Sequence, residues 1–121
     1  MPIERLTVES LRQIIEGKVD RPATCIIKFY TNSCHLCHNL QEHYAELPAQ
    51  YPDVEFFAFN VNDYPQIEKR LKFNGVPTLI EVRTGTHHSK IRVMEEPMNP
   101  HDDTWYRRID MRKFIENKEN Q

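Results

Sequence analysis

Hydrophobic residues along the chain occur in two patterns: short continuous runs, and positions that repeat every three or four residues. Runs of β-branched and aromatic residues, each ended by small polar residues, predict buried strands at 24–30 and 54–61. A short edge strand is expected within 2–6. A hairpin is expected from strands 77–82 and 90–94, which flank the turn 84–88.

Four other stretches carry apolar residues every three or four positions, which predicts amphipathic helices. We expect these helices from the cap Thr7 to Gly17, from Leu36 to Leu47 with Pro48 as the end, around Ile67 and Leu71, and after the cap Asp110. Strands that alternate with helices, followed by a hairpin and a last helix, predict an α/β fold. Its mixed central sheet would carry helices on both faces.

Length and composition limit the class of protein. The 121 residues suffice for one ordinary domain, 1–121, and 39% hydrophobic with 28% charged residues is a globular profile. The formal net charge of -2 provides no basic excess, so we expect neither nucleic acid nor a membrane surface as a partner. No apolar run approaches the roughly 20 residues of a membrane span, and no secretory signal is recognisable. We therefore expect a cytoplasmic monomer.

Reactive side chains are concentrated just after the strand 24–30. Cys34 and Cys37 lie at the start of a predicted helix, one thiol at its tip and the other one turn inside. Unpaired N–H groups and the positive end of the helix dipole favour a thiolate there. Three cysteines are too few for a disulfide scaffold, and a Cys-x-x-Cys pair in a reducing compartment indicates redox catalysis or metal binding. Cys25, within the strand, is expected to be a buried hydrophobe.

A metal site is one alternative interpretation of this pair. His38 lies four residues after Cys34 on the same helical face, where it could serve as a third ligand beside Cys37. No second Cys-x-x-Cys and no His-x3-His completes a tetrahedral set in the sequence. We therefore favour redox chemistry and expect no metal.

The pattern resembles the thioredoxin family in three segments. They are 28–37 (Lys-Phe-Tyr-Thr-Asn-Ser-Cys-His-Leu-Cys), 57–61 (Phe-Ala-Phe-Asn-Val) and 75–78 (Gly-Val-Pro-Thr). The interval from the cysteine pair to the Gly-Val-Pro-Thr segment is close to the one usual in the family. The resemblance covers roughly 5–94 and the last helix, which leaves 95–106 as a loop insertion.

This resemblance implies a thioredoxin-like fold and a thiol-disulfide oxidoreductase that acts on protein disulfides. Cys34 would be the nucleophile and Cys37 the resolving cysteine. A cis Val76–Pro77 bond would lie against them and receive the substrate chain, with Trp105 of the insertion beside it. A thioredoxin reductase would supply electrons, and no cofactor is expected beyond the reversible disulfide. In an alternative hypothesis the chain is a thioredoxin-fold binding subunit of a larger complex, and its thiols are dispensable.

Three residues near the cysteines depart from the family pattern. Ser33 replaces the usual tryptophan, and His35 with Leu36 replaces Gly-Pro. Lys28 stands where the family keeps a buried aspartate. Its stem could be buried while the ammonium reaches solvent, or its charge could stabilise the thiolate of Cys37.

The position of His35 between the cysteines leads to a prediction about the redox potential. A charged imidazolium there would stabilise the Cys34 thiolate, and therefore the reduced form of the couple. We predict a potential above the roughly -270 mV of thioredoxin itself. Equilibration with glutathione or with a reference thioredoxin measures it, and a value at or below that of thioredoxin would contradict the prediction.

Overall fold

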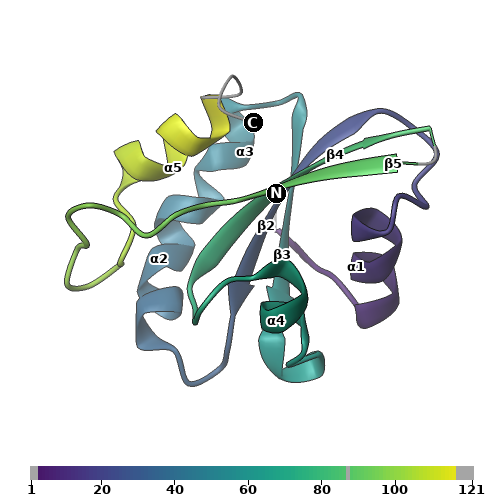
Figure 1. Cartoon of the computed structure of the whole chain (residues 1–121). Coiled ribbons are helices and arrows are strands. Elements are labelled where there is room, and N and C mark those ends of the chain that lie inside the picture. Colours follow the sequence, from purple (N-terminus) through teal and green to yellow (C-terminus); the bar gives the residue numbers. More distant parts are fainter. Residues whose placement is uncertain (1–2, 87, 117–121) are drawn as a thin grey trace.

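The computed structural model describes residues 3–86 and 88–116 and has a five-stranded sheet at its centre (Figure 1). The strands are β1 (Glu4–Arg5), β2 (Ala23–Tyr30), β3 (Val54–Asn60), β4 (Thr78–Gly85) and β5 (His88–Val93). Their order in the sheet is β1-β3-β2-β4-β5. The first three are parallel to one another, whereas β4 is antiparallel to both β2 and β5. The predicted mixed sheet is therefore confirmed.

Helices cover both faces of the sheet, as predicted (Figure 1). They are α1 (Val8–Ile15), α2 (His35–Ala45), α3 (Leu47–Gln50), α4 (Ile67–Leu71), α5 (Arg108–Glu116) and the 3-10 turn η1 (Val61–Asp63). α1 and α4 lie on one face, and α2, α3 and α5 lie on the other. Among the described residues, no helix has the length and apolar character needed to cross a bilayer.

The alternation of side chains along β2 divides the interior into two cores. Ile27 and Phe29 point toward α1 and α4 and belong to the first core. Ile26 points the other way and packs in the second core with residues of α2 and α5. Because side chains alternate between the two faces of a strand, Lys28 lies on the same face as Ile26, beneath α2.

Both predicted ends of α1 are confirmed by their cap geometry. The Thr7 hydroxyl accepts a hydrogen bond from the backbone N–H of Ser10 at 3.1 Å. Gly17 has a φ of +74°, and the N–H of Lys18 reaches back to the carbonyl of Gln13 at 2.9 Å. This left-handed residue with a backward bond is a Schellman-type ending, which glycine favours.

Two other predicted helix ends are wrong. α2 ends at Ala45, and Pro48 lies in the first turn of α3, where its missing N–H leaves no intrahelical bond unmade. α5 begins at Arg108, so Asp110 is inside its first turn and is not its cap residue. The Asp110 carboxylate accepts the backbone N–H of Arg107 at 2.8 Å, which is the reach-back half of a capping box.

The predicted hairpin is present, but its turn is shorter than expected. β4 continues to Gly85 and β5 starts at His88, so both strands enter the segment 84–88 that was predicted as turn. The edge strand occupies only part of the predicted 2–6. Residue 2 and the polar tail 117–121 lie outside the described residues.

Two glycines with positive φ provide a matched test of the fold. A Cβ on Gly17 would lie 2.9 Å from the Cα of His88, whereas a Cβ on Gly75, at φ +84°, would meet nothing within 4 Å. We expect Gly75→Ala to cost about 1 kcal/mol of unfolding free energy through backbone strain alone. Gly17→Ala adds a clash with β5 and should cost at least about 2 kcal/mol. Urea unfolding measures both values, and equal losses would contradict the close approach of β5.

Candidate active site

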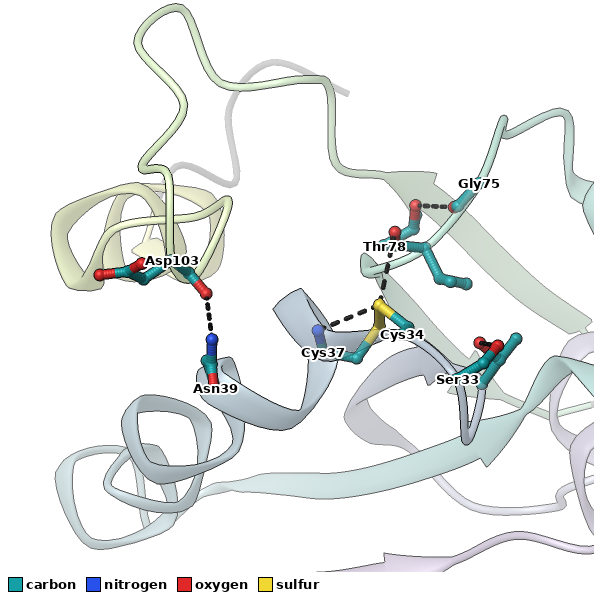
Figure 2. The surroundings of a disulfide bond; sticks show 9 residues. Ser33, Cys34, Cys37, Asn39, Gly75, Thr78 and Asp103 are labelled. Carbon is teal, nitrogen blue, oxygen red and sulfur yellow. Dashed lines mark hydrogen bonds between the residues drawn. A yellow bond between two sulfur atoms is a disulfide. The ribbon is translucent and has the colours of Figure 1, made fainter.

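A disulfide joins Cys34 and Cys37 at the N-terminus of α2 (Figure 2). Cys34 is the N-cap residue, and its Sγ accepts the backbone N–H of Cys37 at 3.0 Å. The two Cα atoms are 5.3 Å apart. Cys34 is partly exposed, whereas Cys37 is buried at 3% exposure. One sulfur is therefore accessible to a partner, and the other is held one turn inside the helix.

The loop between β2 and α2 presents the exposed sulfur. The N–H of Cys34 donates to the carbonyl of Thr31 at 3.3 Å, which closes a tight turn before the helix. The hydroxyls of Thr31 and Ser33 lie 3.5 Å apart. Ser33 and His35, two of the residues that depart from the family pattern, are exposed and stand on either side of Cys34 in the chain.

The segment 75–78 lies directly opposite the disulfide. Cys34 Sγ is 3.8 Å from the carbonyl oxygen of Val76, and the Val76–Pro77 peptide bond is cis. The Thr78 hydroxyl donates to the carbonyl of Gly75 at 2.8 Å, which braces the turn before β4 (Figure 2). The structure therefore brings together the cysteines and the segment predicted to receive a substrate chain.

A groove of about 500 Å³ begins beside this segment. It is bordered by Leu36 at the tip of α2, by Val76 and Pro77, and by Trp105 from the insertion. Leu36 and Glu95 line the groove as well, and neither was predicted from the sequence to do so. Their side chains carry no recognisable catalytic signature, so only the packing of the elements assigns them to the groove.

The segment 95–106, which was predicted to be a loop insertion, is held against α2 by specific bonds. His101 and Trp105 exchange two backbone hydrogen bonds of 2.9 Å, which makes a small closed loop. The Asn39 amide of α2 donates to the carbonyl of Asp103 at 2.9 Å (Figure 2). Tyr106 is buried in the second core at 1% exposure, whereas Trp105 is only partly buried. Burial of Tyr106 thus anchors the segment, and Trp105 stays at the groove.

Lys28 lies on the inner side of α2 and is only 5% exposed. The buried Lys28 lines a second hollow, and Cys37 lines the same hollow. Both predicted roles of its charge, in reaching solvent or in stabilising the Cys37 thiolate, stay predictions. Burial lowers the pKa of Lys28 from 10.5 to about 8. That difference corresponds to roughly 3 kcal/mol lost by the charged form on folding.

The third cysteine, Cys25, and the predicted third metal ligand, His38, take no part in the disulfide. Cys25 is buried at 4% exposure, which confirms the expectation, and burial raises the pKa of its thiol to about 11. The side chain of His38 is exposed. Within 3–86 and 88–116, no three His, Cys, Asp or Glu side chains are grouped so that they could hold a metal ion.

Comparison with known proteins agrees with this geometry. The family model described as Thioredoxin matches residues 4–99. Mitochondrial thioredoxin-3 of Saccharomyces cerevisiae is 33% identical over 66 residues, which cover 54% of this chain and 52% of that protein. Thioredoxin H5 of Oryza sativa subsp. japonica is 26% identical over 77 residues, or 64% and 57% of the two chains. This chain therefore spans little more than half the length of these curated relatives.

A solved structure supports the same assignment of the fold. The crystal structure of oxidized mitochondrial thioredoxin 3 from Saccharomyces cerevisiae superposes with a TM-score of 0.56 at 28% identity. The alignment covers 73% of this chain and 78% of that one. The three-dimensional structure therefore agrees with the resemblance that the sequence motifs indicated.

The different environments of the three thiols predict a large difference in alkylation rate. After reduction, Cys34 is partly exposed, whereas the pKa of Cys25 is raised by burial from 9.0 to about 11. Each unit lowers the thiolate fraction tenfold, so iodoacetamide at neutral pH should modify Cys34 at least about 100-fold faster than Cys25. Peptide mass spectrometry measures the rates. The oxidised protein is the control, in which neither Cys34 nor Cys37 should react.

Proposed function

The chain belongs to the thioredoxin family, and we propose on this basis that it is a thiol-disulfide oxidoreductase that reduces or exchanges protein disulfides. The observation that carries the proposal is the Cys34–Cys37 disulfide at a helix N-terminus, with Cys34 Sγ 3.8 Å from the Val76 carbonyl. The exposed sulfur can meet a second disulfide, and the buried sulfur can complete the exchange.

The reaction proceeds in two displacements. The reduced Cys34 thiolate attacks one sulfur of the substrate disulfide, forms a mixed disulfide and releases the other substrate sulfur as a thiolate. Cys37, after losing its proton, then attacks Cys34 Sγ and releases the second substrate sulfur. Two electrons pass to the substrate, and the Cys34–Cys37 disulfide remains. The backbone N–H of Cys37, which points at Cys34 Sγ, and the helix dipole support the thiolate in the first step.

The substrate chain would lie along Val76 and Pro77, in the groove that Trp105 borders. Three observations support this placement: the closeness of Val76 to the reactive sulfur, the exposure of Ser33 and His35 beside it, and the volume of about 500 Å³. An extended segment could pair with the backbone of Val76, as in strand addition. Trp105 would supply a broad apolar contact.

A thioredoxin reductase is the electron donor that we propose, with the reversible disulfide as the redox centre and no bound cofactor. We place the reaction in a reducing compartment, the cytoplasm, because only three cysteines are present and Cys25 is a buried free thiol. Such a compartment keeps the dithiol available for repeated cycles.

Insulin reduction, driven by a thioredoxin reductase, tests the proposal with three variants. Cys34→Ser should abolish turnover, because it removes the attacking sulfur. Cys37→Ser should also stop turnover but accumulate a mixed disulfide at Cys34, which non-reducing electrophoresis detects. Cys25→Ala is the matched control and should keep the wild-type rate, since that thiol is buried in the first core.

Wild-type activity in Cys34→Ser would refute the assignment of the nucleophile. If the Cys34→Ser, Cys37→Ser double variant fully preserves a biological activity of the chain, that result would favour the thioredoxin-fold binding subunit instead. An inactive wild-type protein with intact fold would refute the proposed activity as a whole.

A further inference from the structure

A second hollow, of about 430 Å³, lies on the inner side of α2 near the disulfide. Its wall comes from the N-terminal segment, β2, β3 and α2, and Cys37 forms part of it. Lys28 extends from β2 into this space. The Lys28 ammonium is 5.2 Å from the ring centroid of Tyr44 and 5.8 Å from that of Tyr30, and both tyrosines also line the hollow.

The ammonium of Lys28 has no anionic partner in the described part of the chain. No hydrogen bond and no ion pair of its Nζ is present among those residues, and the two tyrosine rings are its recorded neighbours. A buried charge is normally paired, because the loss of hydration is otherwise uncompensated. The pKa of Lys28, lowered by burial to about 8, is consistent with that missing partner.

The rest of the wall also favours a negative ligand. Among the residues that the structure describes, no aspartate or glutamate lines the hollow, whereas Arg5 and His38 do. The Asp63 carboxylate forms an ion pair of 2.8 Å with the Arg5 guanidinium, so the positive charge of Arg5 is partly neutralised. Asn32 accepts the Asn60 amide through its own Oδ1 at 3.1 Å, which leaves the Asn32 N–H groups as donors.

The volume and the remaining wall indicate the kind of anion. The hollow falls within the roughly 300–1,000 Å³ typical of small-molecule sites, which is more space than an inorganic ion fills. Ile3, Ala45 and Ala58 supply apolar surface beside the tyrosine rings. We propose that the hollow binds a small organic carboxylate, with the carboxylate on Lys28 and the Asn32 amide and the apolar body against the tyrosine rings. The proposal does not depend on the proposed redox activity, although Cys37 is part of the wall, and the site is complete in the disulfide form.

Titration of the oxidised protein with benzoate tests the site, with the neutral isostere benzamide as the comparison. At constant ionic strength and pH 7, benzoate should shift backbone NMR signals of Asn32 and Cys37 in a saturable way. Lys28→Met should weaken benzoate binding at least about tenfold, because a charge-assisted hydrogen bond is removed. Lys69→Met removes the same charge from exposed α4 and should bind benzoate like the wild type.

The pH dependence provides a second readout that uses wild-type protein alone. Benzoate affinity should fall as the pH rises above about 8, where Lys28 loses its proton. The other groups that face Lys28 are Tyr30, Tyr44, His38 and Arg5 with its partner, while Cys37 is held in the disulfide. Of these, burial raises the pKa of Tyr44 well above its ordinary value, so it stays neutral.

Three results would overturn the proposal. They are equal affinity for benzamide and benzoate, unchanged benzoate affinity in Lys28→Met, and the absence of saturable shifts at the hollow. A thermal melt of the oxidised variant shows whether Lys28→Met folds. If it does not, the benzamide comparison and the pH profile still decide. The insulin assay of the cysteine variants is independent, so failure of either proposal leaves the other standing.

Discussion

The antiparallel pairing of β2 with β4 is the constraint on which the site depends. Its register places Phe29, near the end of β2, opposite Thr78, at the start of β4. The segments that follow one strand and precede the other therefore meet at the same edge of the sheet. The first contains Cys34 and the second contains Val76, and their contact of 3.8 Å follows from this register. A shift by one residue would turn every side chain of the strand to the opposite face and separate the two segments.

The helix that carries the cysteines is fixed to the sheet by a buried tyrosine. The Tyr44 hydroxyl lies 2.7 Å from the carbonyl oxygen of Phe57 and 3.1 Å from that of Ile26, on two neighbouring strands. Its ring packs edge-on against Phe56, with centroids 5.8 Å apart. A polar group at this depth needs such partners. These contacts determine how α2 lies across β2 and β3, and therefore where its N-terminus points.

Lys28 fits its surroundings poorly, because it is a charged residue buried at 5% exposure. A strand covered on both faces normally carries apolar side chains, and a lysine there raises the free energy of the folded state. Such local conflicts in a natural sequence occur at functional or strained sites. The hollow beneath α2 gives this conflict a physical context, because the unpaired charge, Cys37 and the donor-rich wall are all found there. The groove beside Val76 meets α2 at Leu36, whereas this hollow extends along the same helix from Cys37 to Ala45.

Much of the fold and part of the site could be predicted from local sequence. Strand and helix periods, the caps Thr7 and Gly17 and the cysteine spacing are encoded within a few residues, because backbone hydrogen bonding and side-chain periodicity act over that range. The helix boundaries predicted from Pro48 and Asp110 were wrong, since proline and aspartate also stabilise the first turn of a helix.

Other features depend on contacts between residues far apart in the chain. The amide of Asn39 reaches Asp103, and Tyr106 enters the second core while Trp105 stays at the groove. Lys28 faces a hollow and has no anionic partner within 3–86 and 88–116. None of these contacts follows from the spacing of residues in the sequence. Strand register and helix packing bring the partners together, and burial determines the free-energy cost of the Lys28 charge. Local chemistry thus selected the elements and the reactive pair, and long-range packing determined what surrounds that pair.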